Sequence, residues 1–156
     1  MKTIYTFVAI LFISFSAKAQ SSTANQTVTL NLSNQIDISI TADGGKSFTF
    51  DTPQKYADGI TNTEASTLQV RSNKAWSVSV KADAANFTDG TNNIPVNIFS
   101  VGLSGGTLSP LSTSDEVVTS GAKGVNTFKV DYNANPGFDY AGGNYTLSIT
   151  YTATQQ

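Results

Sequence analysis

The sequence predicts an all-β protein, an antiparallel β-sandwich of about seven to nine strands. Apolar and polar residues alternate in most stretches after residue 20, as in strands that bury one face. Glycine, asparagine, aspartate and proline separate these stretches, as turn residues do. In the clearest case Tyr145, Leu147, Ile149 and Tyr151 alternate with serine and threonine. Burying each of these large side chains contributes about 1.5–3 kcal/mol, so the final strand is predicted to lie in the core.

The first residues have the pattern of an export signal. Lys2 supplies a positive charge, Ile4 to Phe15 is an apolar run too short to span a bilayer as a helix, and Ala17-Lys18-Ala19 has the form of a cleavage site. Cleavage there leaves 137 residues (156 − 19), enough for one domain with its own core. The predicted organisation is a signal peptide at 1–19, a flexible lead-in at 20–26 and a single β-sandwich domain at 27–156.

In the first half of the domain, every second residue is apolar in five short stretches. These predict strands at residues 27–32, 36–40, 48–50, 68–70 and 76–80. We expect a turn at Asp43-Gly44-Gly45 and a long surface loop at residues 51–66, with Tyr56 or Ile60 turned inward. Trp76 is expected in the core because it alternates with Val78 and Val80.

The second half continues the same pattern, with Phe87 expected to plug the end of the core. The expected elements are a turn at 89–93, a strand at 94–101, one or two short edge strands within 102–124, a penultimate strand through Phe128, Val130 and Tyr132, and a loop at 133–143 before the final strand.

The charge of the chain argues against some classes of partner. Without Lys2 and Lys18, seven of the nine basic residues face eleven acidic ones, a net charge of −4. With no basic patch, neither nucleic acid nor membrane insertion after signal cleavage is expected. The chain has no cysteine, so it forms no disulfide and must rely on packing.

Catalysis is not expected, and no catalytic residue is assigned. The chain contains neither histidine nor cysteine, which removes the common nucleophile pairs and the soft ligands of zinc and copper. Two close carboxylates would suffice for glycoside hydrolysis, which stays open as a lesser alternative. However, Asp43, Asp58 and Asp89 sit beside turn glycines, and Asp37 occupies an outward strand position.

Calcium is the one metal for which the chain has many oxygen ligands. Two groups are close in sequence but lack the spacing of an EF-hand loop, so no cofactor is assigned and calcium stays an alternative. The groups are Asp83, Asp89, Asn92 and Asn93, and Asp131, Asn133, Asn135 and Asp139.

Three aromatic residues fall in predicted loops and are candidates for contacting a ligand such as a glycan. They are Tyr56, Phe138 and Tyr140. The alternative is that these rings cap one end of the sandwich.

Three stretches resemble strands of bacterial surface proteins. T-V-T-L-N-L-S-N-Q-I-D-I-S-I-T-A-D-G (27–44) resembles the opening strands of fimbrial subunits of the alternate chaperone–usher class, and A-G-G-N-Y-T-L-S-I-T-Y-T (141–152) resembles their closing strand. The closing pattern together with L-Q-V-R-S-N-K-A-W-S-V-S-V (68–80) is also similar to spore-coat-U-like and WxL-like surface domains. This resemblance implies an immunoglobulin-like sandwich used in surface structure or adhesion. Wall binding is not implied, because Trp76-Ser77-Val78 lies mid-chain and the WxL motif lies near the end.

The fimbrial resemblance also implies a role for the N-terminal segment. In that class an N-terminal extension completes the fold of the next subunit by strand addition. Gln26 to Leu32 would be this strand, with Val28, Leu30 and Leu32 in the pockets of the partner. A self-contained monomer would instead bury the same three side chains in its own sheet.

Together these observations predict a secreted, non-enzymatic β-sandwich that acts as a structural or adhesive component of the cell surface. It would be exported to the periplasm, the outer surface or the medium, and its signal ending in Ala-Lys-Ala-Gln resembles those of Bacteroidota-type secreted proteins. Its partners would be other copies of itself or surface-assembly proteins. The alternative is a carbohydrate- or calcium-dependent binding module.

Overall fold

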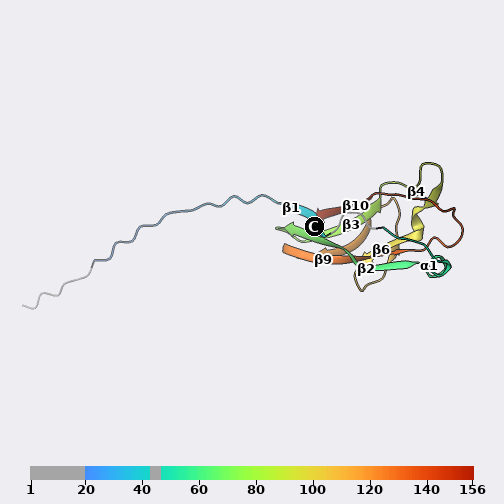
Figure 1. The fold of residues 1–156 in the computed structure, drawn as a ribbon. Coiled ribbons are helices and arrows are strands. Elements are labelled where there is room, and N and C mark those ends of the chain that lie inside the picture. The colour runs from blue at the N-terminus through green and yellow to red at the C-terminus, as the bar shows by residue number, and fades with distance from the viewer. Residues whose placement is uncertain (1–19, 43–46) are drawn as a thin grey trace, which may run out of the picture. The chain divides into compact units, whose positions relative to one another are not determined.

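The structure is a computed structural model that describes residues 20–42 and 47–156 (Figure 1). The chain divides into one unit that ends at Leu32 and a second, compact unit, Ser33–Gln156. The compact unit is an all-β sandwich of antiparallel sheets, which confirms the predicted fold class. The predicted signal peptide and the turn at Asp43-Gly44-Gly45 lie outside the described residues.

Two sheets and one hairpin contain all the strands of the described residues. The larger sheet has the order β1 (Ile36–Ala42), β2 (Ile60–Ser72), β9 (Gly124–Ala134), β6 (Phe99–Leu103) and β7 (Ser109–Pro110). The smaller sheet has the order β10 (Ile149–Gln155), β3 (Trp76–Ala82) and β8 (Glu116–Gly121), and the hairpin joins β4 (Asn86–Thr88) to β5 (Asn93–Pro95). Three of these ten strands have only two or three residues, and β7 and β8 are the edge strands expected within 102–124.

The core lies between the two sheets and follows the predicted alternation. On β3 the side chains of Trp76, Val78 and Val80 are buried, and the indole Nε1 of Trp76 donates a hydrogen bond to the Ala122 carbonyl at 2.9 Å. A Cβ at Gly121 would lie 2.3 Å from Cζ2 of Trp76, so only glycine fits beside the ring. Trp76 is therefore a core residue, as its alternation predicts.

The predicted strand at 48–50 and loop at 51–66 are wrong. Phe48 and Phe50 form no strand, and their rings pack against Phe99 and Tyr56, respectively. A short helix, α1 (Pro53–Asp58), follows, with Thr52 as its N-cap and proline in its first turn, both of which favour helix initiation. β2 then begins at Ile60. Within the described residues, no helix is long and apolar enough to cross a membrane.

The predicted strand at 94–101 is interrupted. β5 ends at Pro95, a short 3₁₀ turn, η1 (Val96–Ile98), follows, and β6 starts at Phe99. Proline ends the ladder because it has no N–H to donate. The apolar positions change phase between Ile98 and Phe99, where the regular strand resumes.

A buried carboxylate fixes the irregular part of the larger sheet. Asp131 on β9 is 7% exposed, and its side chain accepts hydrogen bonds from the backbone N–H of Glu64 at 2.6 Å and of Gly105 at 3.1 Å. The β2–β9 register shifts between Asn62 and Ser66, and Glu64 has a positive φ of 50°. Burial acts to raise the pKa of Asp131, but hydrogen bonds from Ser104 and from the two amides outweigh it and lower the pKa.

Asp131→Asn should therefore reduce stability and change its pH dependence. At pH 7 we expect a loss of about 1–3 kcal/mol, because the buried amides lose a charged acceptor. A lowered native pKa stabilises the fold above the unfolded value near 3.9, and that contribution disappears as pH falls through the native pKa. Urea unfolding at pH 7 and pH 3 should show a gap between wild type and variant that shrinks in acid. The exposed Asp139→Asn is the control, and an equal gap at both pH values would contradict the assignment.

Candidate functional site

Two edge strands, one from each sheet, lie side by side (Figure 1). β10 ends where β1 begins, and the Gln155 side chain donates a hydrogen bond to the Gln35 carbonyl at 2.8 Å. Among the described residues, neither strand has a second neighbour within its own sheet. We call this region the β1–β10 seam. Its inner side chains are Ile36, Ile38 and Ile40 of β1 and Ile149, Tyr151 and Ala153 of β10.

The inner side chains of β1 face the core but are only partly covered by it. Ile38 pairs with Val70 and Ile40 with Leu68, and both partners on β2 are fully buried. Directly paired residues share one face of a sheet, so the two isoleucines also face inward. Nevertheless Ile38 is only half-buried and Ile40 is 55% exposed. The β1 side of the seam is therefore an inward face with incomplete cover: Ile36 and Ile38 pack against the core, and Ile40 is open to water.

The β10 side has the same property, which corrects the prediction of a core strand. Tyr151 and Ala153 pair with Val80 and Val78 of β3, which are buried, yet both are only half-buried themselves. The strand begins at Ile149, later than the predicted alternation begins, and it lies at the edge of its sheet. The alternation predicted correctly which side chains face inward. It contained no information on whether another strand covers them.

A hydroxyl chain ties the two sheets together next to the seam. The Tyr151 hydroxyl lies 3.0 Å from that of Tyr132 on β9, which donates to Ser66 Oγ on β2 at 3.2 Å. Burial, with Tyr132 nearby, raises the pKa of Tyr151, so the phenol stays neutral at physiological pH. This link holds β10 against the larger sheet without filling the seam.

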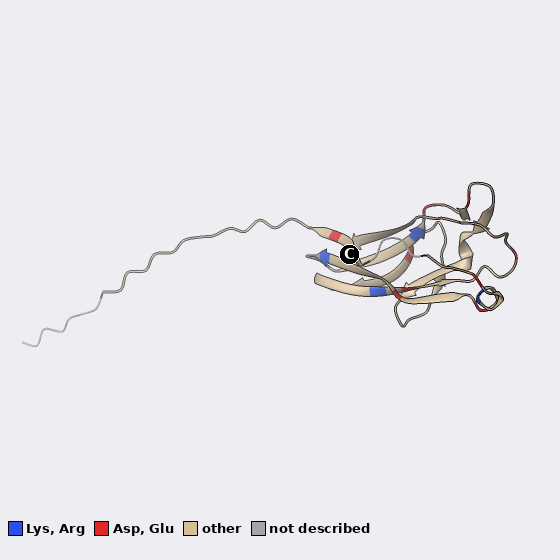
Figure 2. Cartoon of the chain, viewed as in Figure 1, with Lys and Arg blue, Asp and Glu red and all other residues tan. Residues whose placement is uncertain are grey.

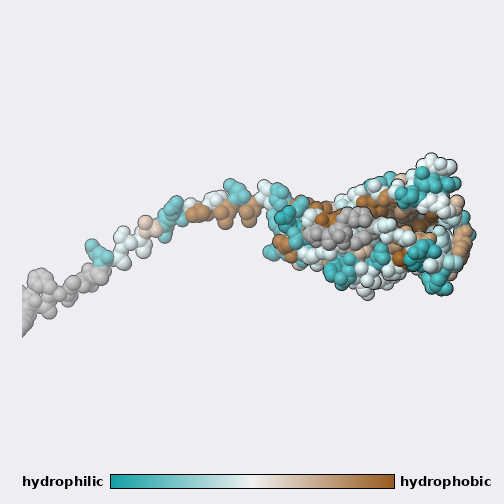
Figure 3. Space-filling model, viewed as in Figure 1, coloured by the Kyte–Doolittle hydropathy of each residue, from teal (hydrophilic) through white to brown (hydrophobic). Residues whose placement is uncertain are grey.

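The N-terminal segment contains the three candidate strand-exchange residues and forms no strand. Val28, Leu30 and Leu32 are 76%, 80% and 87% exposed (Figure 3). The predicted strand at 27–32 is thus wrong for the single chain, and so is burial of these residues in the chain's own sheet. The physical reason is that an alternating segment becomes a strand only when another strand pairs with its backbone.

The segment and the seam have matching patterns. Three apolar side chains, at residues 28, 30 and 32, recur at every second position, as do the three inward isoleucines of β1. Both sets span five residues, which is about 14 Å in extended chain. A strand of this composition has the length and periodicity to cover the seam.

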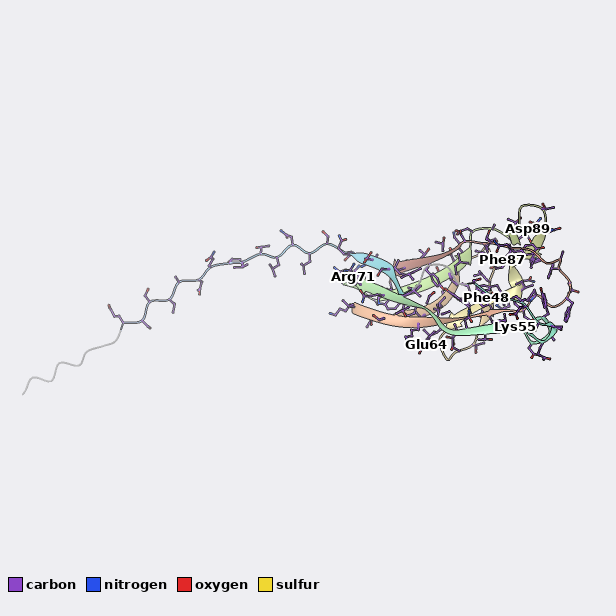
Figure 4. The ribbon with its side chains drawn as sticks, viewed as in Figure 1. Phe48, Lys55, Glu64, Arg71, Phe87 and Asp89 are labelled. Carbon is purple, nitrogen blue, oxygen red and sulfur yellow. The ribbon has the colours of Figure 1, made fainter. Side chains whose placement is uncertain are left out.

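The candidate ligand aromatics are brought together only in part. Tyr56 on α1 stacks on Phe138 with ring centroids 5.3 Å apart, and the half-buried Phe50 supports Tyr56 from the core side. Phe138 is 67% exposed, whereas Tyr140 is half-buried. In Figure 4, Lys55 of α1 lies at the opposite end of the domain from Arg71, which pairs with Asp37 of β1. The aromatic pair is thus remote from the start of β1.

Hydrogen bonds lower the pKa of three aspartates. All carboxyl pKa shifts that are resolved point downward. The Lys55 side chain lowers the pKa of Asp51, and the backbone amides of Asn92 and Thr91 lower that of Asp89. In the view of Figure 2, the charged residues are scattered along the ribbon of the domain. Within the described residues, no three Asp or Glu side chains gather as a metal site would require.

Comparison with known proteins finds only loose likenesses of fold, among solved structures. No family model matches the chain, and no curated protein matches it. Among solved structures, the chain is similar to one from a chaperone–usher pilus, with a TM-score of 0.46 and 13% identity over 92% of this chain and 99% of that one. A likeness at this level establishes neither a family nor a function.

Ile40 and its cross-strand partner Leu68 provide a test of the open seam. If the seam is uncovered, Ile40→Ala should cost less than about 1 kcal/mol in the monomer, because its side chain already contacts water. Leu68→Ala should cost about 2–5 kcal/mol, because it leaves a cavity in the core. Urea unfolding of the chain from Gln20, at concentrations where it is monomeric, measures both. Equal costs would show that Ile40 is covered after all.

Proposed function

We propose that this chain is an exported, non-enzymatic subunit of a surface fibre, in which copies join by strand addition. The segment Gln26 to Leu32 of one copy fills the β1–β10 seam of the next. One observation carries the proposal: inward-facing side chains at the seam are only partly covered, with Ile40 55% exposed, and the chain itself carries an exposed strand-like segment of matching pattern.

The energetics favour this contact. Each of Val28, Leu30 and Leu32 would gain about 1.5–3 kcal/mol on burial, and the partly covered isoleucines of β1 would lose their contact with water as well. An added strand would also pair with the free backbone groups of an edge strand, which otherwise invite uncontrolled pairing. These gains oppose the entropy of association and of ordering the segment.

The geometry of the contact sets the form of the assembly. The donating surface is the N-terminal segment and the accepting surface is the seam, so the contact is heterologous. Heterologous contacts form rings if their rotation closes and open filaments if it does not. A chain that both donates and accepts therefore suits a fibre subunit, which agrees with the export signal pattern at residues 1–19.

Replacing the three apolar side chains of the segment should abolish assembly. The triple variant Val28→Ser, Leu30→Ser, Leu32→Ser removes the apolar contacts with the seam. We expect the chain from Gln20 to form concentration-dependent oligomers in size-exclusion chromatography with light scattering, and the triple variant to stay monomeric. The matched control replaces the alternate face instead: Thr27→Ser, Thr29→Ser, Asn31→Ser. Loss of assembly in both variants, or in neither, would overturn the proposal.

The same triple variant also serves as an acceptor with an empty seam. A synthetic peptide of residues 20–32 should bind it and raise its urea midpoint, whereas the peptide with the three serines should not. A wild-type peptide that does not bind would count against strand addition even if the chain assembles by another route.

A second candidate function is carbohydrate binding at the Tyr56–Phe138 pair. Phe138 is held by stacking, yet its ring remains 67% exposed. Its neighbours on α1 are polar, and Gln54 donates to Asp58 at 2.6 Å. One rigid ring among polar groups suits a sugar, whose C–H face packs on the ring while its hydroxyls meet amides and carboxylates.

Phe138→Ala should weaken glycan binding about tenfold, which corresponds to about 1.4 kcal/mol of lost ring contact. A glycan array screened with the chain from Gln20 identifies the ligand, and titration of both proteins measures the loss. Val125→Ala removes an equally exposed apolar side chain from β9 and should leave binding unchanged. No retained glycan, or equal binding by all three proteins, would exclude this candidate.

A further inference from the structure

The three residues between the N-terminal segment and β1 are held by a set of side-chain amides. The Asn73 side chain donates from Nδ2 to the Ser33 carbonyl at 2.7 Å and accepts at Oδ1 from the Gln35 N–H at 3.0 Å. The Asn73 N–H donates to the Gln35 carbonyl at 3.2 Å, and Gln155 at the end of β10 donates to the same carbonyl. We call Asn73 and Gln155 the amide clamp.

The clamp keeps Ser33 to Gln35 in line with β1. Ile36 pairs with Ser72, the last residue of β2, and the bonds of Asn73 continue this pairing one step beyond the ladder. Gln155 adds hydrogen bonds to Asn73 Oδ1 and to Ser72 Oγ, both at 3.1 Å. Both sides of Asn34 are therefore tied to the turn between β2 and β3.

The register of β1 shows which pairing of the N-terminal segment the amide clamp prevents. Three residues is an ordinary length for a hairpin loop. If Ser33-Asn34-Gln35 formed such a loop, Leu32 would pair with Ile36, Leu30 with Ile38 and Val28 with Ile40. Paired residues share a face, so all three apolar side chains would enter the seam of their own copy. The chain would then close on itself and have no strand to donate.

We infer that the amide clamp decides between these outcomes: Asn73 and Gln155 hold the hinge extended, so that the segment is donated to another copy rather than inserted into its own seam. This inference rests on the proposed strand addition and assigns its specificity to named residues. Turning back would break the bonds at both Ser33 and Gln35, whereas donation to a second copy keeps them.

The test releases the hinge with Asn73→Ala in the chain from Gln20. The concentration needed for half-assembly should rise about tenfold or more, since two hydrogen bonds no longer oppose closure. The resulting monomer should not bind a labelled peptide of residues 20–32, because its own segment fills the seam. Asn126→Ala is the matched control, since this side chain also donates to a backbone carbonyl, that of Ala122 at 3.0 Å, and should assemble as wild type.

A combined variant distinguishes a seam that is filled by the chain's own segment from a seam that the Asn73→Ala substitution has damaged. Adding the three serine substitutions at Val28, Leu30 and Leu32 to Asn73→Ala should empty the seam, so that this monomer binds the peptide. An Asn73→Ala chain that assembles as wild type overturns the inference and leaves strand addition intact. An Asn73→Ala monomer that already binds the peptide also overturns it.

Two further outcomes distinguish failure of the proposed strand addition from failure of the inference about the amide clamp. A wild-type chain that does not assemble and a triple-serine variant that does not bind the peptide overturn strand addition itself, and the inference with it. If Asn73→Ala does not fold, Gln155→Ala, which removes one of the two hydrogen bonds to the Gln35 carbonyl and leaves Asn73 in place, is measured in the same way and judged by the same results.

Discussion

The rest of the structure depends on how far the inner faces of the edge strands β1 and β10 are covered. A sandwich is stable when each sheet covers the apolar face of the other, and here a sheet of three strands packs on a sheet of five. The central strands β2, β3 and β9 each have a neighbouring strand on both sides within their sheet, and most of their inward side chains are buried. At β1 and β10 both sheets end without a further strand among the described residues, so apolar side chains that face inward still contact water.

Polar contacts elsewhere in the domain hold the edge strands β1 and β10 in place. The Tyr151–Tyr132–Ser66 hydroxyl chain connects β10 to the larger sheet. Asp131 fixes the irregular stretch of β2 at its bulge. The amides of Asn73 and Gln155 close the end at which the N-terminal segment joins β1. These polar contacts hold the two edge strands in place without covering their apolar side chains.

This combination gives a physical reason for a chain that is both stable and ready to associate. Its stability comes from the packing of the central strands, and the chain has no cysteine that could add a disulfide. The proposed association would use the incomplete edge, because the same burial that holds the core together is available there to a partner. An aromatic pair at the far end of the domain, Tyr56 and Phe138, offers a separate surface for a ligand. The two surfaces are independent because they lie on different elements.

The sequence by itself determined the fold class, most strand positions and the direction of side chains along them. Those properties follow from period-2 alternation and from turn residues, which act locally. Trp76 as a core residue and β7 and β8 as edge strands were predictable for that reason. The break at Pro95 could also be predicted, since proline cannot continue a ladder.

Only the tertiary structure decided which strands lie at an edge, because this depends on which strands become neighbours. The residues at 27–32 and those of β10 carry the same alternation, yet the first form no strand and the second are half-covered. Likewise, nothing local to Asn73 indicated that its side chain would hold Ser33 and Gln35, about forty positions away.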